Sequence, residues 1–188
     1  MVVNIIDVGL GNINSIEHWT RDCHLFPRRV TNIDQFTNGP IIIPGVASAG
    51  EYMERLKSLA LDKEIIKRCQ SGQKIIGICL GFQQILFCEG ASIIEQKKIY
   101  HGFQSEVLVN NSSKLFNNGQ KFKVGRYHSL KLKEPFKAEN FDITMRCAIS
   151  GAAMSFENNI DKIYGFQFHP ESFLTINGKI LIKKILSA

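Results

Sequence analysis

Three side chains have the types and local settings that nucleophilic catalysis requires, and the first is Cys79. It lies between Gly77 and Gly81, after a short apolar run and before residues that fit a helix. Glycines two positions on either side of a nucleophile are typical of a sharp strand-to-helix turn, because glycine closes such a turn without a side-chain clash. A thiol at the first turn of a helix faces unpaired N–H groups and the positive end of the helix dipole, which favour the thiolate. We therefore predict that Cys79 is a nucleophile, the alternative being a small buried hydrophobic residue.

His169 and Glu171 complete this hypothesis. They flank Pro170 at the end of the apolar run 163–168. Proline keeps the residue before it extended, and residues two apart in an extended chain point to the same side. A carboxylate beside an imidazole can hold the tautomer whose other nitrogen accepts a proton from a thiol. With Cys79, the pair predicts a Cys-His-carboxylate triad, whereas alone it would be a hydrogen-bonded structural pair.

Length and composition limit the class of protein. The chain has 188 residues, of which 44% are hydrophobic, so we expect one compact domain over residues 1–188. No apolar run approaches the ~20 residues that span a bilayer, and the first residues do not resemble a signal peptide, so we expect a cytoplasmic protein with no membrane partner. The net charge of +6 comes from dispersed lysines, and we expect no nucleic-acid partner.

The five cysteines favour a reducing compartment. Their number is odd and no C-x-x-C pair occurs, which fits free thiols better than a disulfide framework. We expect Cys69 and Cys88 to be core residues.

Strand and helix patterns alternate over the first half of the chain. Continuous apolar runs predict buried strands, and apolar stripes at helical spacing predict helices. We expect strands at 2–7, 40–43 and 74–78, and helices at about 13–23, at 51–70 and directly after Cys79. In 51–70 the predicted inward residues are Met53, Leu56, Leu59, Ala60, Ile65 and Ile66. This alternation predicts parallel strands with right-handed crossovers.

Beyond about residue 95 the pattern changes to short alternating runs between Asn, Gly and Ser turns, typical of antiparallel strands. These runs are 103–109, 121–132, 143–148, 152–156 and 163–168. A last helix is expected at 177–186, with Ile180, Leu181, Ile185 and Leu186 inward. The predicted fold class is α/β: a single-domain, open, mostly parallel central sheet flanked by helices, with an antiparallel extension.

A glycine pair near the N-terminus partly matches a dinucleotide-binding fingerprint. Gly9 and Gly11 have the first spacing of G-x-G-x-x-G, but Asn14 occupies the third glycine position. We interpret the pair as loop geometry in preference to a nucleotide site.

Two short motifs carry a resemblance to a known family. The G-x-C-x-G-x-Q pattern of residues 77–83 and the H-P-E of residues 169–171 resemble the triad (class I) glutamine amidotransferases. Residues 7–15 and 43–53 resemble the glutaminase subunit of imidazole glycerol phosphate synthase. By contrast, the glutaminase subunits of anthranilate and aminodeoxychorismate synthases are similar to this chain at residues 100–102, 125–130 and 165–175.

The resemblance implies a glutaminase mechanism. Cys79 would attack the side-chain carboxamide of glutamine, and His169, oriented by Glu171, would protonate the departing ammonia and then activate water. The oxyanion would be held by the backbone N–H of Leu80 and by one from the loop 45–47. In this loop, Ala47 replaces the glycine that is usual in the glutaminase subunit of imidazole glycerol phosphate synthase. The implied substrate-binding residues are Gly45, Val46, Leu80, Gln83, Ser129 and Leu130. No cofactor and no metal is expected, and we expect His128 to have a structural role.

The resemblance also implies a partner. A glutaminase of this size has no room for a second active site, so a separate synthase subunit would receive the ammonia in a heterodimer. We expect a cyclase partner of the imidazole glycerol phosphate synthase type, in histidine biosynthesis; the alternative is a chorismate-binding subunit of anthranilate or aminodeoxychorismate synthase. Two other classes remain open: a catalytically silent binding module of the same fold, and a different Cys-His hydrolase such as a peptidase or γ-glutamyl hydrolase.

Overall fold

The computed structural model describes residues 1–45 and 48–188. Within them, a nine-stranded sheet has the order β2-β1-β3-β4-β11-β10-β9-β6-β7. Its parallel half consists of β2 (Phe26–Val30), β1 (Val2–Ile6), β3 (Ile41–Ile43), β4 (Ile75–Ile78) and β11 (Ile163–Phe166). Its antiparallel half consists of β10 (Ala153–Asn158), β9 (Asp142–Cys147), β6 (Phe103–Val109) and β7 (Lys121–Arg126). The predicted α/β class, a parallel core with an antiparallel extension, is confirmed.

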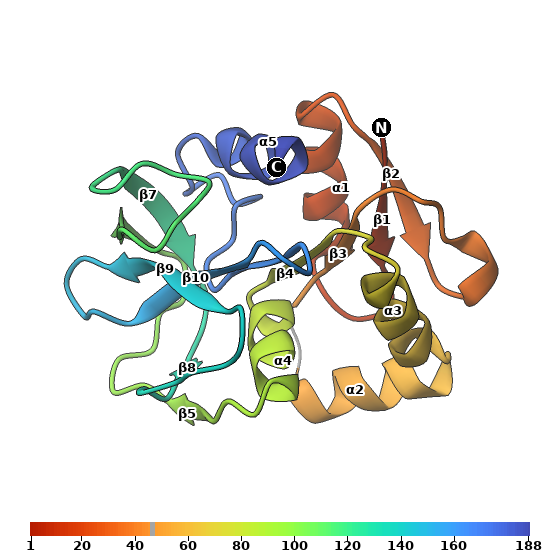
Figure 1. Cartoon of the computed structure of the whole chain (residues 1–188), viewed down its shortest axis with the longest axis horizontal. Coiled ribbons are helices and arrows are strands. Elements are labelled where there is room, and N and C mark those ends of the chain that lie inside the picture. The colour runs from red at the N-terminus through yellow and green to blue at the C-terminus, as the bar shows by residue number, and fades with distance from the viewer. Residues whose placement is uncertain (46–47) are drawn as a thin grey trace.

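Helices cover both faces of the parallel half. Helices α1 (Ile13–Asp22) and α5 (Gly178–Ser187) lie on one face, and α2 (Ala49–Ser58), α3 (Leu61–Gln70) and α4 (Leu80–Cys88) lie on the other (Figure 1). Each face has its own core, one around Trp19 and Leu181 and the other around Leu56 and Leu86. A short 3-10 helix spans Ile33–Gln35. Burial on both faces explains why the central strands are continuously apolar.

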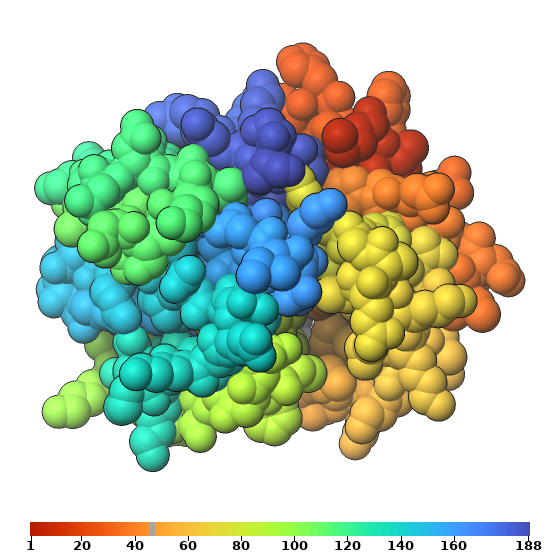
Figure 2. Space-filling model, in the orientation of Figure 1, coloured from red at the N-terminus to blue at the C-terminus, as the bar shows by residue number. Residues whose placement is uncertain are grey.

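The antiparallel half projects beyond these helices. In the space-filling view, the green-to-cyan extension and the orange-to-yellow parallel half occupy opposite sides, with light-blue residues between them (Figure 2). A separate small sheet pairs β5 (Ile93–Glu95) with β8 (Leu130–Leu132). Over the described parts of the chain, no helix is long and apolar enough to cross a membrane.

The helix predicted over 51–70 is wrong in one respect, because it is two helices. The chain breaks at Ala60, which has a left-handed backbone with φ of 55°. The break turns α3, so that Leu61 and Ile65 are buried and Ile66, predicted to point inward, is 57% exposed. Leu59 and Ala60, also predicted to point inward, lie at the break itself and are exposed, Leu59 by 38%. Helical periodicity across residue 60 therefore assigned the wrong face.

Predictions of burial are also wrong for Cys88 and Ile180, and only partly right for Cys69. Cys88 ends α4 on the surface and is exposed, and Cys69 in α3 is only partly buried. In α5, Leu181 and Ile185 are buried as predicted, but Ile180 is 42% exposed. An apolar residue at an element's edge is often left partly in solvent because polar surface cannot cover the whole protein.

Strand β2 was not predicted from the sequence. It is an edge strand that pairs with β1 and carries Pro27, Arg28 and Arg29, most of them facing solvent. Proline and charged residues are acceptable at a sheet edge, where one row of backbone groups needs no partner. The predicted run 121–132 also divides, since β7 belongs to the large sheet and β8 to the small one.

Strand β11 joins the two halves of the sheet and determines the position of the site. It pairs antiparallel with β10, as predicted, but also in parallel with β4, with Phe166 opposite Ile78, which was not predicted. The N–H of Cys79 donates to the carbonyl of Phe166 at 2.7 Å. Because parallel strands end at the same edge of a sheet, the residues that follow β4 and β11 meet there. Segments about ninety residues apart in sequence thus form one site.

Candidate active site

Cys79 occupies the strained turn that its flanking glycines predict. It directly precedes α4 and has φ of 52° and ψ of −98°, an uncommon backbone for a residue with a side chain. A methyl group on Gly77 would lie 2.7 Å from the carbonyl group of Gly81, and one on Gly81 would lie 2.2 Å from the carbonyl oxygen of Ile43. The two glycines therefore allow strand, turn and helix to pack closely, which holds Cys79 at the start of α4.

His169 and Glu171 form the predicted buried pair. The Nδ1 atom of His169 lies 2.6 Å from Oε1 of Glu171, and the two side chains are only 3% and 1% exposed. The backbone N–H of His169 donates to the carbonyl of Gly125 in β7 at 3.0 Å, and its carbonyl accepts from the hydroxyl of Thr175. The antiparallel extension thus fixes the backbone on which the imidazole is carried.

The protonation of His169 follows from these neighbours. Burial alone lowers the pKa of His169, but the charge of Glu171, the nearby Cys79 and the hydrogen bond with Glu171 outweigh it and raise the pKa to about 10. An imidazole with this pKa is a cation at neutral pH. The three predicted catalytic residues therefore lie together, with the imidazole between thiol and carboxylate.

Gln167 also reaches the thiol. Its side chain is fully buried, and its amide Nε2 lies 3.8 Å from Sγ of Cys79. The amide of Gln83 donates to Oε1 of Gln167 at 2.9 Å, which turns the Gln167 N–H groups toward the sulfur. Gln167 was not predicted to be a site residue, although a polar residue within the apolar run 163–168 signals a specific buried partner.

The predicted oxyanion segment is partly described. A methyl group on Gly45 would lie 2.3 Å from the backbone nitrogen of Leu80, so Gly45, two residues after β3, packs directly against the elbow. Val46 and Ala47, which were predicted to bind substrate and to alter the oxyanion loop, lie outside the described residues.

Gln83 and Leu130 line a cavity of about 360 Å³ beside α2 and α4, a volume within the range of about 300–1,000 Å³ typical of small-molecule sites. The backbone carbonyl of Ser129 accepts a hydrogen bond from the N–H of Gln96 at 2.9 Å. Gln83 and Leu130 therefore line the same cavity, and Ser129 directly precedes Leu130 in the chain.

The His128 ring is neutral and held by hydrogen bonds on both nitrogens, which fits its predicted structural role. Its Nδ1 lies 2.7 Å from the carbonyl oxygen of Leu130, and its Nε2 accepts from Nε of the fully buried Arg126 at 3.0 Å. Burial, and to a smaller extent the charges of Arg126 and His169, lower the pKa of His128 to about 4 despite the Leu130 contact. His128 is therefore neutral at physiological pH and braces the segment that contains Ser129.

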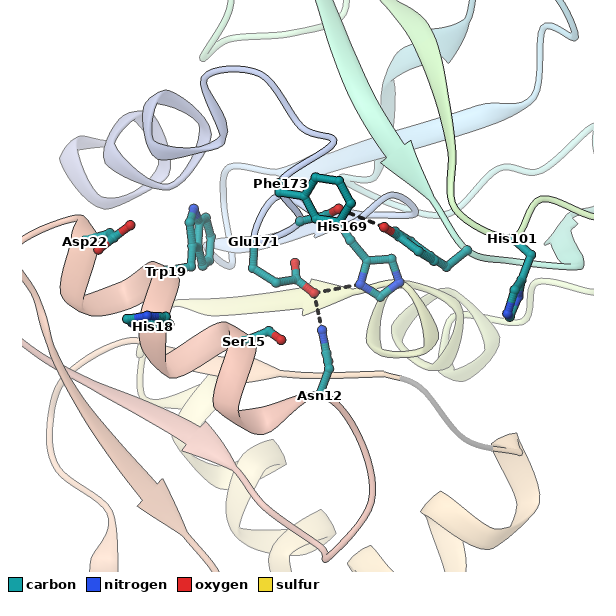
Figure 3. A pocket seen from close by; sticks show the side chains of 11 residues that line it. Asn12, Ser15, His18, Trp19, Asp22, His101, His169, Glu171 and Phe173 are labelled. Carbon is teal, nitrogen blue, oxygen red and sulfur yellow. Dashed lines mark hydrogen bonds and ion pairs between the residues drawn. The ribbon is translucent and has the colours of Figure 1, made fainter.

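A second cavity is lined by two of the triad residues, His169 and Glu171. Its volume is about 640 Å³, and its lining also includes Asn12 and Trp19 at α1, Tyr127 after β7 and Phe173 after β11 (Figure 3). Sequence reasoning missed Asn12, whose side chain contacts Glu171. Among the described residues, no group of three or more His, Cys, Asp or Glu side chains is arranged to hold a metal ion.

Comparison with known proteins finds relatives named as a component of anthranilate synthase, which favours this resemblance over the one to imidazole glycerol phosphate synthase. Anthranilate synthase component 2 of Lactococcus lactis subsp. lactis is 39% identical over 119 residues, which cover 62% of this chain and 60% of that protein. Component 2 of Saccharolobus solfataricus is 29% identical over 189 residues, covering 99% and 92%. The sequence-based preference for an imidazole glycerol phosphate synthase is therefore not supported.

A solved structure and a family model bear on the fold and on the family. A GMP synthase protein from Thermoplasma acidophilum superimposes with a TM-score of 0.80 at 23% identity, covering 100% of this chain and 92% of that one, which is evidence for the fold alone. The model named "Glutamine amidotransferase class-I" matches residues 4–188. This chain therefore belongs to the class I glutamine amidotransferase family.

Proposed function

We propose that this chain is the glutaminase component of an anthranilate-synthase-type complex. It hydrolyses glutamine to glutamate and ammonia and passes the ammonia to a chorismate-binding synthase subunit. The observation that carries the proposal is the position of Cys79 on a strained elbow beside His169, which is paired with the buried Glu171. Family membership supports glutamine as the substrate, and the relatives named anthranilate synthase component 2 support the type of partner.

In the first half of the reaction, Sγ of Cys79 forms a bond to the carboxamide carbon of glutamine. The raised pKa of His169 keeps its ring protonated beside the attacking sulfur. The developing oxyanion accepts hydrogen bonds from the N–H of Leu80 and from the loop that follows Gly45, each worth about 3–4 kcal/mol in related acyl transfers. His169 then gives its proton to the amide nitrogen as the C–N bond breaks, releasing ammonia and leaving a thioester.

In the second half, the now neutral imidazole of His169 takes a proton from water. The resulting hydroxide attacks the thioester carbon, the C–S bond breaks, and glutamate leaves while the thiolate of Cys79 is restored. Throughout both halves, Glu171 holds the Nδ1 side of the ring and compensates its positive charge.

The cavity beside α4 is the proposed glutamine site. It is lined by Gln83, which lies one helical turn after Cys79, by Leu130 of β8, and by Met53 and Gly50 of α2. The amide of Gln83 is already oriented by Gln167, so its geometry is fixed before substrate arrives.

The decisive experiment measures glutamate release by the purified chain, alone and with a chorismate-binding synthase subunit or a (β/α)₈ cyclase. We expect the chorismate-type subunit to stimulate release and to form anthranilate from chorismate and glutamine, followed by its fluorescence. Cys79→Ala should abolish both activities, whereas Cys88→Ala, at the exposed end of the same helix, should retain them.

Other outcomes would change the proposal in defined ways. Stimulation by the cyclase alone would replace the chorismate branch with the histidine branch. No release with either partner, together with failure of a glutamine-analogue electrophile to label Cys79, would favour the silent binding module. Cleavage of peptides but not glutamine would indicate a different Cys-His hydrolase.

A further inference from the structure

We propose that Asn12 is a positioning residue of the triad, whose side-chain amide holds Glu171 in the orientation that His169 requires. This inference rests on the proposed glutaminase function and assigns to it a residue from the opposite end of the chain. Asn12 precedes α1, about 160 positions before Glu171 in sequence.

The contacts of Glu171 carry the proposal. Its Oε1 atom accepts hydrogen bonds both from Nδ1 of His169 and from Nδ2 of Asn12, which approach the same oxygen from different directions (Figure 3). Over the described residues, the other carboxylate oxygen, Oε2, is buried and has no hydrogen-bond partner. Asn12 therefore supplies the second of two bonds that orient a carboxylate whose side chain is only 1% exposed.

The second bond matters because one bond leaves the carboxylate free to rotate. A buried anion also needs hydrogen-bond donors to remain ionised, and an amide N–H supplies one without adding a charge. With Asn12 in place, Oε1 of Glu171 is held at the Nδ1 side of His169. The other ring nitrogen of His169 is then directed to the thiol side.

The side chain of Asn12 contacts Glu171 instead of capping α1. It occupies the N-cap position of α1, where asparagine is among the preferred residues because its side-chain oxygen can accept a backbone N–H. Here the side chain makes no cap hydrogen bond and turns toward Glu171. A residue that breaks a local rule without a local gain is typical of a functional position.

Glycines and hydrogen bonds fix the backbone of the loop before Asn12 and so position this residue. Gly9 and Gly11 have φ of 77° and 111°, values that favour glycine. The N–H of Gly9 donates to the carboxylate of Asp7 at 2.9 Å, and Arg55 of α2 donates to the carbonyl of Val8 at 3.2 Å. The glycine pair therefore shapes a braced turn that carries Asn12, which explains the incomplete dinucleotide fingerprint.

Asn12→Asp tests this role against a merely structural one. Aspartate has nearly the size of asparagine and is an equally good helix N-cap residue, so the start of α1 should be preserved, and kcat is measured well below the melting temperature of each variant. It removes the amide donor and adds a like charge beside Glu171, so we expect kcat to fall by roughly 10- to 100-fold, the effect of losing a hydrogen bond to a charged group. KM should stay within about twofold, because Asn12 lines the 640 Å³ cavity and not the one that contains Gln83.

Asn14→Asp is the matched control. It makes the same change two residues along, where Asn14 is exposed and accepts from Arg29 at 2.6 Å, so kcat should be unchanged. Unchanged kcat in Asn12→Asp, or a loss that only follows a lower melting temperature, would overturn the proposal.

If the unsubstituted chain releases no glutamate with any partner, the proposed function fails but the role of Asn12 is still decided. Titration of the His169 ring by NMR then provides the readout. The pKa of His169 should rise in Asn12→Asp, because a second negative charge favours the imidazolium, and should not move in Asn14→Asp. No shift in Asn12→Asp would refute the positioning role.

Discussion

The coupling between His169 and Glu171 predicts a measurable dependence of stability on pH. Glu171→Gln replaces the carboxylate with an amide of nearly the same shape, so it removes the charge without leaving a cavity. In the unsubstituted chain this charge, together with hydrogen bonds, holds the pKa of His169 at about 10, against an ordinary value of 6.5. The folded protein therefore binds a proton at His169 that the unfolded chain has released between these two pH values.

The sign and size of the effect follow from this difference. A group whose pKa is raised by folding stabilises the folded state fully below its unfolded pKa, and this contribution is lost as pH rises through the folded pKa. At about 1.4 kcal/mol for each pH unit, the interval from 6.5 to about 10 corresponds to up to about 5 kcal/mol. Nearly all of it should disappear in Glu171→Gln, apart from the smaller contribution of Cys79.

The assay is urea unfolding at a series of pH values from 6 to 10. We expect the difference in free energy of unfolding between the parent chain and Glu171→Gln to be largest near pH 6 and to shrink by several kcal/mol toward pH 10. Glu54→Gln, an exposed carboxylate on α2, should show no such trend. A difference that stays constant over this range would refute the electrostatic coupling.

Three further predictions concern the scaffold. Gly81→Ala should lower the free energy of unfolding by about 1–3 kcal/mol and cut glutaminase activity roughly 100-fold. The reason is that its methyl group would lie 2.2 Å from the carbonyl oxygen of Ile43 and displace the elbow. The control Gly50→Ala, with open space at its Cβ, should not be destabilised. His128→Gln should flatten the loss of stability between pH 6.5 and about 4, worth about 3 kcal/mol, since burial lowers the pKa of His128 to about 4 and the unfolded chain takes up the proton first; an unchanged acid limb in urea unfolding would contradict this. Lys74→Met should destabilise the chain by about 1–2 kcal/mol and speed amide hydrogen exchange in the last turn of α5, because Lys74 donates to the carbonyl of Ile185 at 2.6 Å; equal exchange rates would show that this contact is dispensable.

The sequence by itself determined the local chemistry. The elbow around Cys79 was predictable because its glycines and the following helix act within a few residues, and the same holds for the extended His169-Pro170-Glu171 segment. The α/β class also followed from local signals, since buried strands and helical stripes alternate in the chain. These features depend on backbone sterics and on periodicity, which a sequence displays directly.

Tertiary structure decided which of these parts meet. The parallel pairing of β11 with β4 brings the end of the chain to the thiol, yet its short run after four similar ones predicted only the antiparallel pairing, which β11 makes with β10. Strand partners lie far apart in sequence, so no local pattern specifies them. The break at Ala60 and the exposed edge strand β2 were missed for a related reason, because packing overrode helical periodicity at one and edge position removed the apolar signal at the other.

The same division applies to the site. Cys79, His169 and Glu171 were found from their own neighbours in the chain, whereas Asn12 and Gln167 gain their contacts only when distant loops and strands converge. A polar side chain has no partner in the sequence until the fold supplies one. Motifs therefore selected the candidate reacting groups, and the folded sheet determined which distant side chains contact them.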